Sequence, residues 1–401
     1  MAKGEKDIFK IAVFSGAIPS SMFIEAFIEE LAKHHKILLF GVVDQVTKYY
    51  SKNIKILKTP KTHWSNLIVS LYRTLFLILK RPNDLLLLFQ EISRYNRLYD
   101  KWIWYSKFLP IILYRPDIFH MQWTRDLEFY TFLKTRFHIP IVVSFRGAHV
   151  NYSPIVEPYI ADIYKKTFPK VDAFHAVSEA IVIEAQQYGE IKDITRIIHS
   201  PIRSLFFENY QRFKKREEPI FKIGSVGRFH WIKGMKYAFD SCIILKDAGF
   251  SFEYSCITTN SINEEQLFQI QQLGLNDHIK IKEALAQTDL IEEMKTFDLL
   301  LLTSLEEGIA NVVLEAMALG IPVISTDCGG MCEVVKPRDT GWLVPVRDPQ
   351  AIANAIIEVS ETSESEMQRI TQNAHNFVKT HFNSEDSIKQ FLILYELVAS
   401  T

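Results

Sequence analysis

The stretch "FDLLLLTSLEEGIANVVLEAMALG", residues 297–320, contains the pattern that decides the fold. The leucine run Leu299–Leu302 is typical of a buried strand in a parallel sheet. A turn with Gly308 follows, and a helix is expected from about Asn311, the predicted N-cap. Gly320 is a typical helix stop. The stretch therefore predicts a buried strand, a tight turn and a helix.

Apolar runs of the same kind alternate with helix-length segments along the rest of the chain. They form two sets: residues 9–16, 36–43, 117–123, 139–147, 171–178 and 195–201, and then residues 218–229, 250–258, 278–284, 297–305, 321–330 and 341–346. Strands separated by helices imply right-handed crossovers and doubly wound parallel sheets. The predicted fold class is α/β, with two Rossmann-like domains that face each other across a cleft. Ligands are expected there, at the carboxyl ends of strands.

The length of 401 residues also favours more than one domain. We expect an N-terminal domain over residues 1–207, a charged linker over 208–219 and a C-terminal domain over 220–383. The tail, residues 384–401, has apolar residues at helical spacing. It is expected to form a helix that can pack back on the N-terminal domain.

Composition is typical of a soluble globular protein, with 48% hydrophobic and 23% charged residues. The first residues lack the apolar run of a signal peptide, and no uncharged apolar stretch reaches about 18 residues. We therefore expect a cytoplasmic protein without a membrane span. The motif "CGGMC", residues 328–332, suggests a metal site, but no second Cys or His pair lies at zinc-finger spacing. Reduced thiols are the better interpretation.

Charge is distributed unevenly along the chain. Residues 1–200 hold 27 basic and 19 acidic residues, against 19 and 28 in the remainder, and residues 51–150 hold 16 and 6. This excess predicts an anionic partner for the N-terminal half. Residues 63–114 are expected to be helical, and they are basic and rich in Trp and Tyr. Helices of this composition are typical of a membrane interface, so residues 60–115 are a candidate contact with an anionic membrane. Helices packed on the first sheet would look the same, and both alternatives stay open.

Two carboxylates flank the turn of the opening stretch. A helix start behind a glycine turn offers free N–H groups and a partial positive charge, which suit a phosphate. Glu315, about one turn into the helix, could accept hydrogen bonds from a diol such as ribose, and Glu307 reaches from the other side of the turn. A helix-dipole glutamate and a solvated loop glutamate would also explain the pair.

A second stretch, "SVGRFHWIKGMKYA" at residues 225–238, adds two cations. Arg228 follows a predicted strand and Lys233 lies at the start of the next helix, so together they can neutralise a diphosphate. Gly227 permits close approach of the backbone. The stretch is not a P-loop, and the absence of a G-x-G-x-x-G fingerprint argues against a dehydrogenase.

With these motifs the chain resembles glycosyltransferase family 4, the retaining glycosyl transferases group 1 of the GT-B superfamily. The resemblance rests on four segments, "GRFHWIKG" (227–234), the E-x7-E of "EGIANVVLE" (307–315), "AMALGIPVISTDCGG" (316–330) and "TGWLVPVRDP" (340–349). It is looser in the N-terminal half, where it rests on "RPDIFHMQW", "IPIVVSFRG" and "VDAFHAVSEA".

The resemblance implies transfer of a sugar from a nucleoside-diphosphate sugar to a hydroxyl acceptor, as in the synthesis of lipopolysaccharide, capsule or exopolysaccharide. Arg228 and Lys233 would hold the diphosphate and stabilise the leaving nucleotide, and Glu307 would contact the transferred sugar. These three are the expected catalytic residues, and Glu315 would bind the ribose. Further donor-binding positions are expected at Gly16, Gly227, Gly308, Ile309, Ala310, Asn311 and Val312.

No D-x-D motif is present to hold a divalent metal, so no metal or other cofactor is expected and the two cations would take its place. The resemblance implies retention of anomeric configuration. On the acceptor side we expect His120 and Arg146, although relatives often carry His where Arg146 stands. A glycan or a lipid-linked acceptor is the expected partner, and nucleic acid is not.

Two other functions fit the same architecture. A sugar-nucleotide epimerase or phosphorylase would also bind the donor, but it would need no hydroxyl acceptor. A non-catalytic subunit could bind nucleotide sugar for an active partner. The intact set Arg228, Lys233, Glu307 and Glu315 argues against that subunit.

Overall fold

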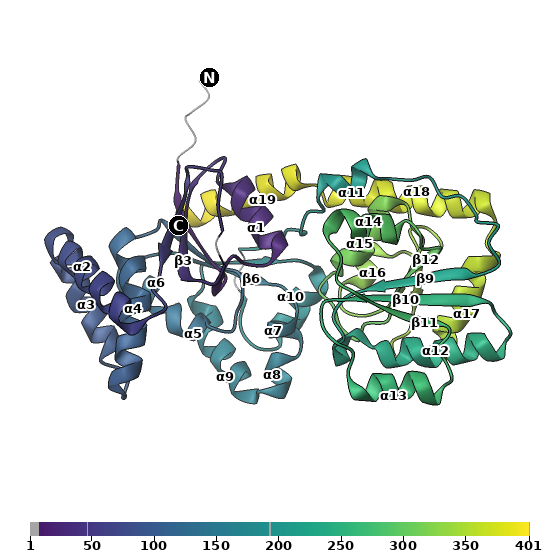
Figure 1. Ribbon diagram of the computed structural model, residues 1–401. Helices are drawn as coiled ribbons and strands as arrows, with labels where there is room; N and C mark the ends of the chain where they lie inside the picture. The colour runs from purple at the N-terminus through teal and green to yellow at the C-terminus, as the bar shows by residue number, and fades with distance from the viewer. Residues whose placement is uncertain (1–7, 46, 192–193, 401) are drawn as a thin grey trace, which may run out of the picture. The chain divides into compact units, whose positions relative to one another are not determined.

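The computed structural model describes residues 8–45, 47–191 and 194–400. Residues 1–7, on which the expected absence of a signal peptide partly depends, lie outside the described residues. The described chain forms two compact units, each built around one parallel sheet (Figure 1). The first unit comprises the chain up to Val177, then Val182–Ile198 and the residues from Ile388 onward, and the second comprises Ser178–Ile181 and His199–Ser387.

The sheet of the first unit has the strand order β2-β3-β1-β5-β6-β7-β8, with β4 also paired to β3. In register, Ile11 of β1 lies between Ile37 of β3 and Ile118 of β5. The strands are β1 (Lys10–Phe14), β2 (Ala17–Ile18), β3 (Lys36–Val43), β4 (Ile54–Lys58), β5 (Ile118–Met121), β6 (Ile141–Phe145), β7 (Ala173–Ala176) and β8 (Thr195–Ile197). The winding reverses between β1 and β5, which is where such sheets bind ligands.

Helices cover this sheet, and one of them comes from the far end of the sequence. The helices are α1 (Met22–Leu31), α2 (His63–Lys80), α3 (Pro82–Ile92), α4 (Leu98–Tyr114), α5 (Leu127–Tyr130), α6 (Phe132–Phe137), α7 (Ala148–Asn151), α8 (Ser153–Val156), α9 (Pro158–Thr167), η1 (Phe168–Lys170), α10 (Glu179–Gln186) and α19 (Ser384–Ala399). Phe391 and Tyr395 of α19 share a buried cluster with Ile11 of β1 and Phe27 of α1. The C-terminal helix is therefore part of the first unit's core.

The sheet of the second unit has the strand order β11-β10-β9-β12-β13-β14, and every pairing is parallel. Its strands are β9 (Phe221–Val226), β10 (Phe252–Thr258), β11 (Ile279–Glu283), β12 (Leu299–Leu302), β13 (Val323–Thr326) and β14 (Trp342–Val344). Its helices are α11 (Ser204–Glu208), η2 (Trp231–Lys233), α12 (Met235–Asp247), α13 (Glu264–Gln272), α14 (Gln287–Met294), α15 (Asn311–Leu319), α16 (Met331–Val334), α17 (Pro349–Glu361) and α18 (Glu364–His381). The order is that of a Rossmann fold, which confirms the predicted α/β class with two parallel sheets.

The leucine run of β12 is buried because helices cover both faces of this sheet. Leu299 and Leu301 belong to the cluster that contains residues of α12 and α17, whereas Leu300 and Leu302 belong to the one that contains residues of α15 and α18. Figure 1 shows α12 and α13 on one side of the strands and α15 and α18 on the other. Alternate side chains thus enter opposite cores, as expected for a parallel sheet.

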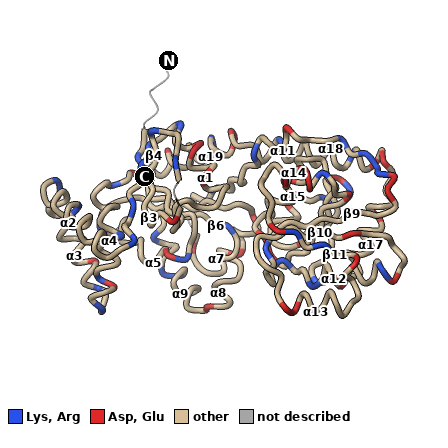
Figure 2. Tube along the Cα trace, viewed as in Figure 1, with Lys and Arg blue, Asp and Glu red and all other residues tan. Residues whose placement is uncertain are grey.

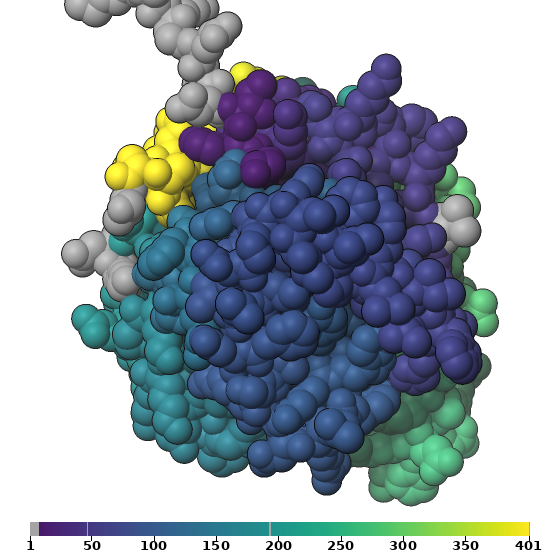
Figure 3. Space-filling model, turned by 90° about the vertical axis from the view of Figure 1, so that its left-hand side faces the viewer, coloured from purple at the N-terminus to yellow at the C-terminus, as the bar shows by residue number. Residues whose placement is uncertain are grey.

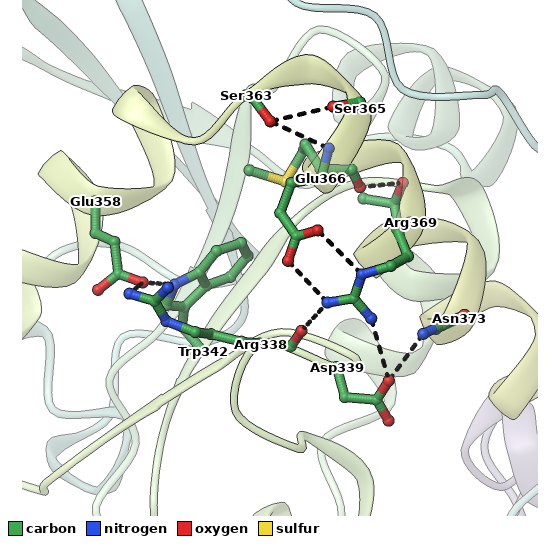
Figure 4. A network of polar contacts seen from close by, with 11 residues as sticks. Arg338, Asp339, Trp342, Glu358, Ser363, Ser365, Glu366, Arg369 and Asn373 are labelled. Atoms are coloured by element: carbon green, nitrogen blue, oxygen red, sulfur yellow. Dashed lines mark hydrogen bonds and ion pairs between the residues drawn. The ribbon is translucent and has the colours of Figure 1, made fainter.

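The segment "TGWLVPVRDP" is held by a polar network (Figure 4). The Trp342 Nε1–H donates to Glu358 Oε1 over 2.6 Å, and Arg338 Nη2 lies 2.9 Å from the same oxygen. Arg369 of α18 donates to the Arg338 carbonyl over 2.7 Å and pairs with Glu366. These ion pairs are largely exposed and screened by water, so they add little to stability. We infer that their main effect is to fix the geometry of the loop.

Among the described residues, no helix has both the length and the apolar character needed to cross a bilayer. Within the same ranges, no group of His, Cys, Asp and Glu side chains could hold a metal ion. The four cysteines are unpaired thiols, of which Cys242, Cys256 and Cys328 are buried and Cys332 is exposed.

Candidate functional site

The candidate donor residues of the second unit gather where its sheet changes winding direction, at the carboxyl ends of β9 and β12. Gly227 and Arg228 follow β9, and residues 303–308 follow β12. A Cβ atom placed on Gly227 would meet only Lys233 Cε, at 3.9 Å, so the space above this backbone is open to a ligand. A small hollow at this point is lined by residues that include Gly227, Arg228, Lys233, Thr258 and Thr303.

Lys233 and Glu307 form an ion pair at the centre of this group. Lys233 Nζ lies 2.5 Å from Glu307 Oε1, which also accepts a hydrogen bond from Ser304 Oγ over 2.7 Å. The two side chains are only 26% and 15% exposed, so water screens the pair weakly. A phosphate would compete with Glu307 for the ammonium group, and a sugar hydroxyl could then occupy the carboxylate.

Backbone contacts fix the loops that carry this pair. The Leu305 amide donates to the Ile232 carbonyl over 2.7 Å, and Thr303 Oγ1 donates to the Lys233 carbonyl over 3.0 Å. Gly234 has φ +60°, and a Cβ atom there would lie 2.1 Å from the Thr303 carbonyl oxygen. Only glycine permits this approach, which brings the cation on one loop within reach of the carboxylate on the other.

The glycines of "CGGMC" support the loop that carries Glu307. The Gly330 amide donates to the Gly308 carbonyl over 3.0 Å and lies 3.2 Å from the Glu307 carbonyl oxygen. A Cβ atom on Gly329, whose φ is +52°, would lie 1.8 Å from the Glu307 carbonyl oxygen, and one on Gly330 would lie 2.1 Å from that of Gly308. This support of the loop was not predicted from the sequence, although the repeated glycine of the motif was a signal for it.

Helix α15 begins one residue earlier than predicted, since Asn311 was the expected N-cap. Ala310 is its N-cap and Asn311 its first helical residue, because the Val313 amide closes the first turn onto the Ala310 carbonyl. No described residue accepts from the amides of Asn311 and Val312, so these donors point outward with the positive end of the helix dipole. The Ala310 amide instead lies 3.3 Å from Met331 Sδ, its acceptor.

Glu315 lies on α15, partly buried. Burial raises the pKa of its carboxyl to about 7, and the nearby guanidinium of Arg203 opposes that rise. A carboxyl group that titrates near neutrality in a ligand-binding region is a recognised mark of function. Arg203 precedes α11 and was not among the predicted site residues, since nothing in its local sequence connects it to α15.

Arg228 is exposed on the loop after β9, and it forms no ion pair with any described residue. The pKa of the neighbouring His230 is lowered by burial and by the charges of Arg228 and Lys233. Neutral His230 Nδ1 accepts from the Ile232 amide over 3.4 Å and so caps the short helix η2. Two cations, Arg228 and Lys233, therefore lie at this end of the sheet, and the loop after β12 adds the carboxylates of Glu306 and Glu307.

The three remaining candidates, Gly16, His120 and Arg146, belong to the first unit. Gly16 has φ +86°, and a Cβ atom on it would meet nothing within 4 Å. Arg146 donates to Gln122 Oε1 over 2.9 Å and its guanidinium lies over the Phe23 ring at 5.0 Å. Burial lowers the pKa of Arg146 to about 10. Their predicted donor and acceptor roles stay predictions.

His120 is fully buried in a directional hydrogen-bond chain. The Ile198 carbonyl can only accept, so His175 Nε2 donates to it over 2.8 Å and His175 Nδ1 accepts from Ser144 Oγ, also over 2.8 Å. Ser144 Oγ in turn accepts from His120 Nε2 over 2.8 Å, which leaves His120 Nδ1 to accept from the Tyr395 hydroxyl over 2.7 Å. Burial lowers the pKa of His120 well below its usual value, with a smaller effect from Arg146. This environment is that of a structural histidine.

Comparison with known proteins identifies the second unit. Residues 206–377, which hold every second-unit candidate from Gly227 to Glu315, match the family profile described as "Glycosyl transferases group 1". Residues 206–377 of the chain belong to the glycosyl transferases group 1 family. The expected family 4 resemblance is therefore confirmed.

Relatives of this protein include enzymes of bacterial polysaccharide synthesis. It is 28% identical over 267 residues to the "Amylovoran biosynthesis glycosyltransferase AmsK" of Erwinia amylovora, a match that covers 64% of each chain. It is 30% identical over 264 residues to the "Putative colanic acid biosynthesis glycosyltransferase WcaL" of Salmonella typhimurium, again with 64% of each covered. The match thus spans slightly less than two thirds of the length of these curated relatives.

Solved structures of the same architecture support the fold. A glycosyltransferase from Rickettsia africae superposes with a TM-score of 0.70 at 18% identity, covering 98% of this chain and 99% of its own. The Anabaena protein HepE in complex with UDP and glucose superposes with a TM-score of 0.69 at 17% identity, covering 98% and 100%. At these identities the likeness concerns the fold.

Proposed function

We propose that this protein transfers a sugar from a nucleoside-diphosphate sugar to a hydroxyl acceptor, with retention of anomeric configuration. We place the reaction in the cytoplasm, in the synthesis of a cell-surface polysaccharide. The observation that carries the proposal is the ion pair between Lys233 and Glu307 at the switch point of the second unit's sheet. It sets one cation and one carboxylate beside an open glycine backbone, in a family of sugar transferases.

The proposed roles follow from the charge of each group. Negative charge develops on the departing nucleoside diphosphate as the bond from the anomeric carbon to phosphate breaks. Lys233, Arg228 and the free amides at the start of α15 would stabilise that charge, and a fixed donor of this kind typically contributes about 3–4 kcal/mol to a transition state. Arg228 and Lys233 would thereby take the place of a divalent metal ion, which is the role that the sequence analysis expects of them.

The two carboxylates would recognise the uncharged parts of the donor. When the Lys233 ammonium group binds the diphosphate instead of Glu307, the Glu307 carboxylate would accept hydrogen bonds from hydroxyls of the transferred sugar. Glu315 would accept from the ribose hydroxyls, the role that the family resemblance predicts. Curated relatives that act in amylovoran and colanic acid synthesis support a polysaccharide acceptor. Since HepE has been solved with UDP and glucose, uridine diphosphate is the first nucleotide to test.

The test begins with calorimetry of UDP, GDP, ADP and their common sugars against the wild type, Lys233→Met and the conservative Lys233→Arg. We expect one nucleotide to bind, and Lys233→Met to weaken it about tenfold to a hundredfold, the loss typical of a hydrogen bond to a charged group. Lys236, which is exposed on α12, supplies the matched control, and Lys236→Met should bind as the wild type does.

Product analysis then separates transfer from the alternatives. The labelled sugar should appear in water or in an added glycan acceptor, whereas an epimerase would return a changed sugar nucleotide without an acceptor. The proposal fails if a folded wild-type protein binds none of the nucleotides, or if Lys233→Met and Lys236→Met bind equally well.

A further inference from the structure

Helix α2 turns its apolar side away from the protein. Six large side chains on this helix are between 54% and 79% exposed: Trp64, Ile68, Leu71, Tyr72, Leu75 and Leu79. With 3.6 residues per turn these positions share one side of the helix, which we call the apolar α2 face. Figure 3 views the molecule from the end that carries α2, α3 and α4, and their blue spheres form the centre of that view.

The side of α2 that packs on the protein is mostly polar. Its buried residues are Asn66, Ser70, Arg73 and Leu77. Arg73 Nη2 donates to the Lys58 carbonyl over 3.0 Å, but Asn66 Oδ1, Ser70 Oγ and Arg73 Nη1 have no hydrogen-bond partner among the described residues. A surface helix in water normally does the reverse, with its apolar stripe toward the core. The inverted orientation indicates that the apolar α2 face meets an apolar medium.

The charges around this face indicate which medium. Helix α2 contains no acidic residue, and its trace in Figure 2 carries none of the red of Asp or Glu. Exposed Lys61 precedes the helix, where it lies 3.7 Å from Asp44, and exposed Lys80 ends it. Basic residues at the ends of an apolar, Trp- and Tyr-containing helix face are typical of helices that lie in the headgroup region of an anionic membrane.

We propose that the apolar α2 face docks the protein on an anionic lipid bilayer, with α2 parallel to the surface. The six apolar side chains would enter the headgroup and upper acyl region, while Lys61 and Lys80 would contact lipid phosphates. The proposal adopts the membrane alternative for residues 60–115, which the sequence left open. It goes beyond the proposed transfer reaction and does not depend on it.

Vesicle flotation tests the docking with the full chain and without any sugar nucleotide. Wild-type protein should float with vesicles of phosphatidylglycerol and phosphatidylcholine, and much less with phosphatidylcholine alone. Ile68→Ser/Leu75→Ser should lower the partition coefficient at least about tenfold, because two buried aliphatic side chains are lost from the lipid contact. Lys61→Gln/Lys80→Gln should weaken binding to the anionic vesicles only.

A matched control comes from α13 of the second unit, where Leu267 and Phe268 are 51% and 66% exposed. Leu267→Ser/Phe268→Ser should float as the wild type does. Since all of these side chains are exposed, each variant should keep the wild-type melting temperature, which verifies folding.

Three results would overturn the docking. The wild type could fail to float with anionic vesicles, or the α2 variant could float as well as the wild type. Light scattering could also reveal a dimer that Ile68→Ser/Leu75→Ser converts to a monomer with vesicle binding unchanged, which would make the face an interface between copies. Nucleotide binding is measured separately, so failure of the docking and failure of the proposed transfer are distinguishable.

Discussion

The carboxyl group of Glu315 should make donor binding depend on pH. Its pKa is raised to about 7, chiefly by burial, and the ionised form is the better acceptor for ribose hydroxyls. Affinity for a sugar nucleotide, whose diphosphate diester does not titrate near neutrality, should therefore rise as pH rises through that pKa. Between pH 6 and pH 8 the increase should be about tenfold. Calorimetry at the two pH values measures it.

The control for this effect is Glu315→Gln, which keeps the shape of the side chain but cannot ionise. It should bind more weakly at pH 8 and lose most of the pH dependence. Glu361→Gln, at an exposed glutamate of α17, should keep both the affinity and its slope. An unchanged slope in Glu315→Gln would assign the pH dependence to another group.

At the level of elements, the loop that carries Glu307 depends on a glycine beneath it. Gly329→Ala would place a Cβ atom 1.8 Å from the Glu307 carbonyl oxygen, and the backbone there has φ +52°. We expect the loop to shift and donor affinity to fall at least about tenfold, since a small misplacement of contact groups is costly. Calorimetry measures the affinity, and urea unfolding measures the accompanying loss of stability.

A control at Gly249 distinguishes the effect of steric overlap at Gly329 from the effect of backbone strain alone. Gly249 lies between α12 and β10 with φ +71°, and a Cβ atom on it would meet nothing within 4 Å. Gly249→Ala should lose about 1–2 kcal/mol of stability through its left-handed backbone alone and should bind the donor normally. Equal losses of affinity in the two variants would refute a specific support of Glu307 by Gly329.

The sequence predicted some elements well and others poorly, for physical reasons. The run Leu299–Leu302 and the other buried strands were predictable because a strand covered on both faces is apolar throughout. Strand β4, with the sequence IKILK, was missed because it mixes lysine with apolar residues, and among the described strands it pairs with β3 alone. Likewise, the composition of residues 63–114 indicated basic, aromatic helices, but no sequence pattern tells which side of α2 faces the protein.

The candidate site was predicted only in part, because its geometry joins distant segments. The motifs indicated Lys233 and Glu307, but their direct ion pair depends on the approach of two loops and could not be foreseen. The hydrogen-bond chain through His120 could not be foreseen for the same reason, since its partner Tyr395 lies 275 positions away in the sequence. A histidine at a strand end does not reveal whether it will be enclosed.

At the level of the whole molecule, His120 should contribute to unfolding in acid. Its pKa in the folded protein lies well below the usual value, so below about pH 6.5 the unfolded chain takes up a proton that the folded one does not. Stability therefore falls as pH falls, by up to about 1.4 kcal/mol per pH unit from this residue. Urea unfolding at pH 7.5, 6.5 and 5.5 measures the slope.

Two variants isolate this contribution. His120→Gln should be less stable at every pH, because it interrupts a buried chain, but its stability should fall less steeply in acid. His381→Gln removes an exposed histidine at the end of α18 and should retain the wild-type slope. The prediction is wrong if His120→Gln and the wild type lose stability in parallel.

The placement of α19 also affects how the protein is made. Six side chains of α19, among them Phe391 and Tyr395, complete a core that otherwise consists of residues from the N-terminal half of the chain. A ribosome releases the whole of the second unit before it releases these side chains, so the second unit can finish folding first. The first unit, although translated earlier, has to wait with an exposed apolar sheet face and an unfilled place beside His120. The growing chain is therefore most exposed to aggregation, and to chaperones, through the half that emerges first.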